Sequence, residues 1–427
     1  MTARQAYANV RRMNPVLALG LVAAAGIAVT HLPRLQGRPL PHSTLILATG
    51  APLALLGVVL GPGIGVLEPS VLRTLAPVTA LAIGWIGAVL GSRFEWRVVR
   101  RIPRAAWTIV LAQAGAVCVL VAPAAWLLAR WRPALAEAWA PTLPAVLTLT
   151  AIAVVSGPAA VARVARAAGA RRTVANAIGL AAALDTAIGA LGFTVAIAWL
   201  AAPASALAAV RVWGTWLLWA VGSGVVTGAM FVWLTRAEPG DGANIGLWLL
   251  GTMLFGTGVG YAAGLSPLIV SAVAAGVVVN GSAHRRRVQQ ALQAWELPLQ
   301  AILLIIAGAL LRLPTPWLLV AAAVLAALRV LGKWAPVRGA RALLRTESLP
   351  RGVGLATVAQ GGIAVALAVN FYLAQGSDAA GSIVTTVVLG MACAQLAAPP
   401  LMIRALRHPP TAPPPSPAAP APLPEPG

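Results

Sequence analysis

Long apolar runs, repeated along nearly the whole chain, are the feature that most limits what this sequence can fold into. The 427 residues are 59% hydrophobic and only 10% charged, whereas a soluble protein usually has about 25% charged residues. Each run of roughly 17–25 apolar residues is long enough to cross a bilayer core as a helix. The pattern therefore predicts an all-α polytopic membrane protein, and it argues against an ordinary water-soluble fold.

Thirteen such runs can be separated by their charged loops, which predicts about 13 transmembrane helices. They cover approximately residues 15–32, 43–61, 71–91, 106–129, 142–168, 174–200, 207–235, 243–261, 264–281, 295–311, 316–335, 352–375 and 379–403. The runs divide the chain into an N-terminal extracytoplasmic segment over 1–14, a transmembrane domain over 15–403, and a Pro-rich tail over 404–427. The composition of that tail predicts disorder.

The positions of the 31 Lys and Arg residues predict the orientation in the membrane. Most of them lie in loops after odd-numbered runs, including Arg285–Arg287 and the stretch from Lys333 to Arg351. Loops rich in Lys and Arg stay in the cytoplasm, so we expect an outside N-terminus and a cytoplasmic C-terminus in the cytoplasmic membrane. The +21 charge shows no patch with interleaved aromatics. The expected partner is therefore the lipid bilayer, and no nucleic acid is expected.

Two runs are interrupted by residues that break helices. The triplets are Ser156-Gly157-Pro158 in the fifth run and Gln360-Gly361-Gly362 in the twelfth. Proline removes a backbone hydrogen bond, and paired glycines weaken a helix. Interrupted helices at corresponding positions of two halves point to the binding site of a secondary transporter. The two runs are seven apart and so cross in opposite directions, as an inverted repeat requires. For the glycine pair alone, close helix packing is the alternative.

Asp185 is the acidic residue that the predicted topology places deep in the membrane. The other nine acidic residues fall in loops, at run ends or in the tail. Asp185 lies about 16 Å into its run at 1.5 Å per residue, and an acid at that depth is by default functional. A carboxylate there can hold a proton or a metal cation, which is the minimal site of an antiporter. A buried Asp that only ties helices together is the structural alternative.

Arg329 is the basic residue that we place inside a run. Its side chain could snorkel to the surface, or it could balance Asp185 or the negative end of a broken half-helix. Cys118 and Cys393 are expected to be buried apolar side chains. No cofactor motif and no metal-ligand cluster is found, so no cofactor is expected, and no metal beyond a transported cation. An intramembrane enzyme would need a second catalytic group near Asp185, and no His, Cys or Lys is expected in a neighbouring run.

At these same residues the sequence resembles the monovalent cation/proton antiporter superfamily. The similarity is greatest to its second branch, the bacterial sodium/proton antiporters and potassium efflux proteins, and it spans roughly residues 15–403. The motifs that carry it are Leu60-Gly-Pro-Gly-Ile-Gly, Gly84-Trp-Ile-Gly-Ala-Val-Leu-Gly-Ser-Arg-Phe-Glu95, Ser156-Gly-Pro-Ala-Ala-Val-Ala-Arg163, Leu184-Asp185-Thr186, Gly264-Leu-Ser-Pro, Ala275-Gly276, Arg329-Val-Leu-Gly-Lys333 and Gln360-Gly-Gly.

The resemblance implies a homodimer of thirteen-helix subunits that exchange Na⁺ or K⁺ for H⁺ by alternating access. Each subunit would have a dimerising panel and a mobile core of inverted repeats, in which two broken helices cross beside the ion site. By the same resemblance, Asp185 and Thr186 would bind the proton and cation, and Ser156 would coordinate the ion. Arg329 would match the basic residue that faces the crossed helices.

Three positions depart from the family pattern. At one of them, some relatives have Lys where this chain has Arg329. Leu184 stands where many relatives have a polar or acidic residue, and Gly157 stands where many have Asp or Ser. A single carboxylate beside a fixed Arg favours one-for-one, electroneutral exchange as a hypothesis. A small organic ion as substrate, or a degenerate member that transports nothing, are the alternatives.

Overall fold

Within its described ranges, the computed structural model is built of helices and shows no strand. It describes residues 17–25, 28, 51–102, 104–140, 142–167, 172–200, 205–237, 244–344 and 353–406. The first helices are α4 (Ala51–Val58) with the π-helical turn η1 (Val59–Gly63), α5 (Pro69–Thr74), α6 (Ala76–Gly91), α7 (Trp96–Val99), α8 (Arg104–Trp131), α9 (Pro133–Trp139), α10 (Leu143–Val154) and α11 (Pro158–Ala167).

The second half of the chain continues in the same way. Its helices are α12 (Arg172–Leu200), α13 (Ala206–Leu234) with the 3₁₀ turn η2 (Thr235–Ala237), α14 (Ile245–Ala262), α15 (Pro267–Gly281), α16 (Arg285–Ala309), α17 (Trp317–Leu344), α18 (Val353–Ala356), α19 (Gly362–Gln375) and α20 (Asp378–Leu406).

The predicted membrane spans are found as helices. In the described ranges, eight helical stretches are long and apolar enough to cross a bilayer, one of them combining α10 and α11, and four shorter apolar helices accompany them. Residues 17–25 are helical as well and fall in the first predicted run. Every predicted run therefore contains helix, which confirms the all-α polytopic membrane fold. The segment 1–14 and the tail beyond Leu406 lie outside the described residues.

Two helices extend well beyond the apolar runs from which they were predicted. α16 begins at Arg285, ten residues before the predicted start, and α17 continues through Leu344, nine residues past the predicted end. Apolarity marks only the part of a helix that faces hydrocarbon, because basic side chains are accommodated near a helix end. Lys333 lies inside α17 and inside the predicted run 316–335, although its charge was assigned to the basic loop that follows.

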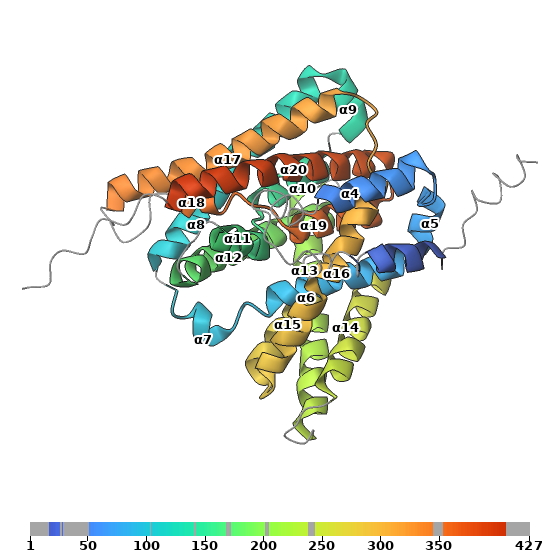
Figure 1. Ribbon diagram of the computed structural model, residues 1–427, viewed down its shortest axis with the longest axis vertical. Helices are drawn as coiled ribbons and strands as arrows, with labels where there is room; N and C mark the ends of the chain where they lie inside the picture. Colours follow the sequence, from blue (N-terminus) through green and yellow to red (C-terminus); the bar gives the residue numbers. More distant parts are fainter. Residues whose placement is uncertain are drawn as a thin grey trace, which may run out of the picture.

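The helices pack in two groups around the interrupted segments. α8, α10, α12, α17 and α20 pack against one another, whereas α6, α13, α14, α15 and α16 form the second group with α4. Figure 1 shows α17 and α20 along one side, α13, α14 and α15 on the other, and α10 and α19 near the middle. α19 contacts members of both groups and also α10, so the two interrupted helices meet where the groups adjoin.

Glycine allows α6 and α15 to approach closely. A Cβ atom on Gly87 would collide with the backbone of Leu268, and one on Gly91 would collide with that of Ala272. Small residues at such spacing let membrane helices pack backbone to backbone. The prediction that Cys118 and Cys393 are buried is wrong, because both thiols are free and lie on exposed helix faces. Apolar composition alone does not tell a helix face that packs from one that faces lipid.

Candidate functional site

The two interrupted helices meet where their chains are extended. α10 ends at Val154 and α11 begins at Pro158, while α18 ends at Ala356 and α19 begins at Gly362. At the crossing, the Gly157 N–H donates a hydrogen bond to the Ala359 carbonyl over 2.9 Å. The two predicted breaks are thus brought together in space, and each leaves backbone groups that the helices themselves do not satisfy.

Gly157 is required at this crossing by lack of space. A Cβ atom on Gly157 would collide with the backbone of Gly361, and one on Gly361 would lie 3.1 Å from the Gly157 Cα. A side chain at this position would not fit without a shift of the backbone. Backbone carbonyl groups are therefore available as oxygen ligands where a side chain is absent.

Asp185 lies near the middle of α12 and faces the crossing with no solvent exposure. Its Oδ2 atom accepts hydrogen bonds from the Ser156 hydroxyl, at 2.9 Å, and from the Lys333 ammonium, at 2.5 Å. Its Oδ1 atom is buried and has no hydrogen-bond partner among the described residues. A buried carboxylate oxygen without a partner is costly. It is the atom on which a proton or a cation could be held.

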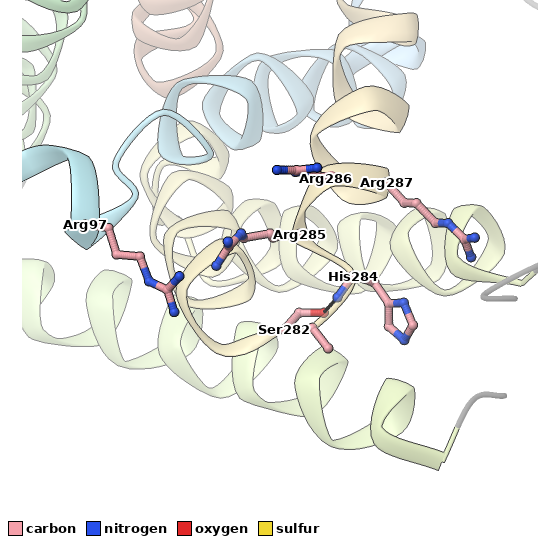
Figure 2. Close-up of a pocket in the computed structure, with 7 residues that line it drawn as sticks. Arg97, Ser282, His284, Arg285, Arg286 and Arg287 are labelled. Atoms are coloured by element: carbon pink, nitrogen blue, oxygen red, sulfur yellow. Dashed lines mark hydrogen bonds between the residues drawn. The ribbon is translucent and has the colours of Figure 1, made fainter. Parts of the chain in front are cut away.

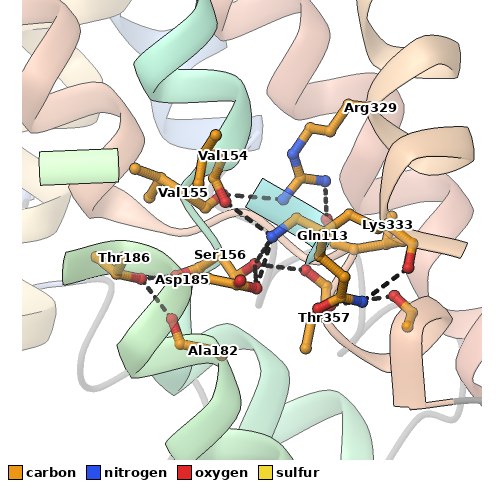
Figure 3. Close-up of polar contacts among 12 residues, drawn as sticks. Gln113, Val154, Val155, Ser156, Ala182, Asp185, Thr186, Arg329, Lys333 and Thr357 are labelled. Carbon is orange, nitrogen blue, oxygen red and sulfur yellow. Dashed lines mark hydrogen bonds and ion pairs between the residues drawn. The ribbon is translucent and has the colours of Figure 1, made fainter. Parts of the chain in front are cut away.

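Lys333 is the functional residue that the sequence prediction missed. Its ammonium is fully buried and donates to the Asp185 carboxylate, to the Val154 carbonyl at 2.8 Å and to the Ser156 hydroxyl at 3.0 Å (Figure 3). All three of its donors are thereby used. One signal could have found it, because residues four apart share a helix face and Lys333 follows Arg329 by four. It also corrects the expectation that no Lys lies near Asp185.

Arg329 binds backbone carbonyls and makes no ion pair with Asp185. Its guanidinium donates to the carbonyls of Ala153, at 2.8 Å, and Val155, at 2.9 Å, on one broken helix, and to Val358 on the other. The side chain is buried, so it does not snorkel to the surface. Of the roles considered, this geometry fits the one at the negative end of a half-helix, whereas the direct partner of Asp185 is Lys333.

The C-terminal end of α10 has its last four carbonyl groups bound by side chains from elsewhere. Ile152 accepts from the Gln360 amide at 3.1 Å, Ala153 and Val155 accept from Arg329, and Val154 accepts from Lys333. These are the four carbonyls that a helix end leaves unsatisfied, and the two cations also complement its partial negative charge. Gln360 is held in turn through its own carbonyl, which accepts from Gln395 of α20 at 2.6 Å.

Ser156 and Thr186 are the remaining polar side chains predicted for the site, and both are buried at the crossing. The Ser156 hydroxyl has two acceptors in reach, Asp185 and the Thr357 carbonyl at 2.8 Å, but only one proton to donate. The Thr186 hydroxyl likewise lies within reach of the carbonyls of Ser156 and Ala182. Each hydroxyl can therefore change its acceptor when the charge on Asp185 changes.

Other predicted residues border the site. Pro158 is the first residue of α11, and Gly362 is the first residue of α19, packed against the Gln300 side chain of α16. Leu184 is buried and contributes no ligand atom. From α8, the Gln113 amide donates to the Lys333 carbonyl at 2.7 Å and fixes that turn of α17.

Two small cavities flank the crossing. One, of about 20 Å³, is lined by Gly157, Gly361, Glu296 and Gln300, among others. The other, of about 40 Å³, is bordered by Arg329 and Gln360. A cavity needs roughly 10–15 Å³ to hold a water molecule, so each has room for water and neither has room for a large molecule. Hydration could therefore reach the crossing from two sides.

The arrangement suits the binding of a small hard cation or a proton. Cations of this kind take oxygen ligands, and the crossing gathers carboxylate, hydroxyl and carbonyl oxygens around Asp185. The ammonium of Lys333 occupies one of these oxygens, so it competes directly with any ion that approaches.

No protein-family model matches the sequence, and no curated protein matches it.

Among solved structures, the fold is similar to that of the sodium proton antiporter MjNhaP1 from Methanocaldococcus jannaschii at pH 8. The likeness has a TM-score of 0.66 and covers 92% of this chain and 98% of that chain, at 14% sequence identity. The similarity therefore extends over nearly the whole of both proteins. It confirms the predicted antiporter fold.

Proposed function

We propose that the protein is a secondary active transporter, not an enzyme, which exchanges a monovalent cation, Na⁺ or K⁺, for H⁺ across the cytoplasmic membrane. The observation that carries this proposal is Asp185, fully buried at the crossing with Oδ2 held by Lys333 and Oδ1 unpartnered. The fold, which is similar to that of a sodium proton antiporter, supports it. Alternating access of a site between two groups of helices would carry the ion across, and a homodimer is part of the same proposal.

Exchange follows from competition for one carboxylate. A proton on Oδ1 neutralises Asp185 and weakens its attraction for a cation, whereas a cation on the ionised carboxylate excludes the proton. The Ser156 hydroxyl and the carbonyls of the crossing, such as that of Thr357, lie where they would complete an oxygen shell. Because the two ions cannot share Asp185, each crossing of the membrane moves one or the other.

Lys333 changes the expected stoichiometry. Electroneutral exchange rested on a single carboxylate beside an arginine, which stays protonated. A lysine beside the same carboxylate can release its proton, and a bound cation favours that release because like charges repel. We therefore propose that cation binding expels protons from both Asp185 and Lys333. The protein would then exchange two protons for one monovalent cation and move one net charge per cycle.

Of the three alternatives to this proposal, two are weakened by an observation. A small organic ion would need more room than cavities of about 20 and 40 Å³ provide. An intramembrane enzyme has a second reactive group after all, in Lys333, but all three donors of that ammonium are used within the protein. A degenerate member that transports nothing is distinguished by the experiment below.

Asp185→Asn is the direct test. In proteoliposomes with a pH gradient, the wild-type protein should dissipate the gradient when Na⁺ or K⁺ is added, and Asp185→Asn should abolish that response. The matched control is Asp378→Asn, because Asp378 is an exposed carboxylate at the start of α20 that pairs with Arg312. This control should retain wild-type rates, and testing each cation separately identifies the substrate.

Two results would overturn the proposal. One is full activity in Asp185→Asn protein that elutes as a folded species, since the shared site would then lie elsewhere. The other is a wild-type protein that responds to none of the alkali cations over a wide pH range, as a non-transporting member would.

A further inference from the structure

A cavity far from the crossing is lined mainly by cationic side chains. It measures about 470 Å³, and its lining includes Arg97 of α7, the turn at Ser282 and His284, and the first residues of α16, Arg285, Arg286 and Arg287. We call it the arginine pocket. Sequence alone explains these arginines as an ordinary positive-inside loop, which requires positive charge but no particular arrangement.

The arrangement of the side chains goes beyond that requirement. Figure 2 shows Arg97 and Arg285, which come from different elements, reaching toward each other, with Arg286 directed to the same side of α16. Glu95 lies 3.6 Å from the Arg285 guanidinium. Among the described residues it is the one carboxylate paired with Arg97, Arg285 or Arg286, and converging like charges repel unless an anion lies between them.

The walls of the pocket are fixed to each other. Asn280, in the last turn of α15, accepts from the Trp96 N–H at 2.7 Å and donates to the Phe94 carbonyl at 3.0 Å. Gln289 of α16 donates to the Ser92 carbonyl at 3.1 Å. The segment that carries Arg97 is thereby attached to both α15 and α16, so the fold holds the backbone of Arg97 beside the start of α16.

The pocket lies at the end of the hydrocarbon zone. α16 is one of the helices able to cross a membrane, and the three arginines are its first residues. Beside them, Trp96 and Val98 of α7 are 64% and 43% exposed. Exposed tryptophan next to arginine is typical of the membrane–water interface. This is the depth at which phospholipid phosphates lie.

We propose that the arginine pocket binds a phosphate group. Guanidinium groups match phosphate oxygens in geometry and charge, and the positive end of the α16 dipole adds to the attraction. Two sources carry this chemistry, the headgroup of an anionic phospholipid and free phosphate. The interfacial depth favours the lipid, because basic pockets between membrane helices on the cytoplasmic side bind such headgroups.

The test uses the full-length protein in non-ionic detergent and four additions: phosphatidylglycerol, phosphatidylcholine, inorganic phosphate, and sodium chloride at matched ionic strength. The thermal midpoint and the lipid adducts in native mass spectra are measured. The pocket variant is Arg97→Gln/Arg286→Gln. The control is Arg100→Gln/Arg104→Gln, which removes two exposed arginines of the same region that do not line the pocket.

We expect phosphatidylglycerol to raise the thermal midpoint of the wild type and the control equally. In the pocket variant its apparent affinity should fall at least about a hundredfold, since each direct hydrogen bond from a guanidinium to the phosphate is worth about 1.5–3 kcal/mol and the control loses none of them. A larger effect of phosphatidylglycerol than of inorganic phosphate assigns the lipid as source, and the reverse assigns free phosphate.

The proposal is overturned if both variants lose affinity to the same extent, because the effect would then be general surface charge. It is also overturned if neither phosphatidylglycerol nor phosphate exceeds phosphatidylcholine and salt. Should the pocket variant fail to fold, Arg97→Gln compared with Arg100→Gln applies the same criteria without altering α16. Cation/proton exchange in vesicles is a separate measurement, so the failure of one proposal leaves the other intact.

Discussion

At the scale of single residues, Lys333 decides what the site can do. Four residues separate it from Arg329, so both side chains leave the same face of α17, but they have different partners. Arg329 binds carbonyls of the broken helices, whereas Lys333 binds the carboxylate itself. An arginine holds its proton under all ordinary conditions, while a buried lysine can release it. Arg329 therefore provides a permanent positive charge at the broken helices, and Lys333 provides a positive charge beside Asp185 that can be lost with its proton.

Lys333→Gln tests whether that second proton moves. If the wild type exchanges two protons for one cation, an imposed membrane potential of 100 mV should change its equilibrium cation gradient by about fortyfold, since one net charge is worth about 2.3 kcal/mol per 100 mV. The variant keeps Asp185 and should exchange one for one, so its gradient should not depend on potential. Both are measured in proteoliposomes with a potassium diffusion potential, using Na⁺ as the transported ion.

Arg338→Gln is the control for this experiment. Arg338 lies on the same helix, where its guanidinium stacks over the Trp334 ring, away from Asp185. It should behave as the wild type does. Equal dependence on potential in the wild type and Lys333→Gln would show that Lys333 carries no proton, and a wild type that ignores the potential would restore the electroneutral hypothesis.

At the scale of elements, the two broken helices depend on α17 to satisfy their ends. Three carbonyls, from residues 153, 155 and 358, accept from one guanidinium, so Arg329 joins α10 to the segment between α18 and α19. A buried carbonyl without a donor costs about 1–3 kcal/mol. The crossing is therefore stable only while this side chain is in place.

Arg329→Lys should destabilise the protein although it preserves the charge. A lysine ammonium is a point donor and cannot reproduce the planar fork that reaches two broken helices. Losing two of the three bonds should cost about 2–6 kcal/mol, seen as a fall of several degrees in the thermal midpoint in detergent. Arg338→Lys on the same helix should change the midpoint little. A midpoint unchanged in Arg329→Lys would contradict the supporting role.

The sequence predicts the broken elements well because their causes are local. Pro158 and the pair Gly361-Gly362 weaken a helix wherever it lies, and an acid at the depth of Asp185 stands out in any apolar run. Lys333 was missed because it was assigned to the basic loop after its run, although it lies inside the run and inside α17. Whether a basic side chain near a run end reaches the surface or turns inward is set by neighbouring helices.

At the scale of the whole molecule, the number and order of helices follow from the apolar runs, and the packing between them does not. The thirteen runs all contain helix in the described ranges. The exposed positions of Cys118 and Cys393 were not foreseen, because a lipid-facing side and a packed side are equally apolar. The close approach of Gly157 to Gly361 joins residues two hundred positions apart, which no local pattern reports.

Orientation in the membrane is the remaining property of the whole molecule that sequence predicts. Lys333 lies in a helix and no longer counts among the basic loop residues. The loops expected in the cytoplasm still hold a strong excess of Lys and Arg without it, including Arg285–Arg287. The positive-inside rule still places those arginines in the cytoplasm. α16 has 25 residues and so is about 37 Å long at 1.5 Å per residue, which exceeds a bilayer core of about 30 Å. This helix is therefore long enough for its two ends to lie on opposite sides of the membrane, and we predict that they do.

Single cysteines at those two ends test the prediction. In a Cys118→Ser/Cys393→Ser background, Leu313→Cys should react with a membrane-impermeant maleimide added to intact cells, since Leu313 is 54% exposed in the loop after α16. Ala283→Cys, exposed just before α16, should react only after the membrane is permeabilised. The background without added cysteine should not react in either case. The opposite labelling pattern would show that the protein has the reverse orientation, with the arginine pocket at the outer leaflet.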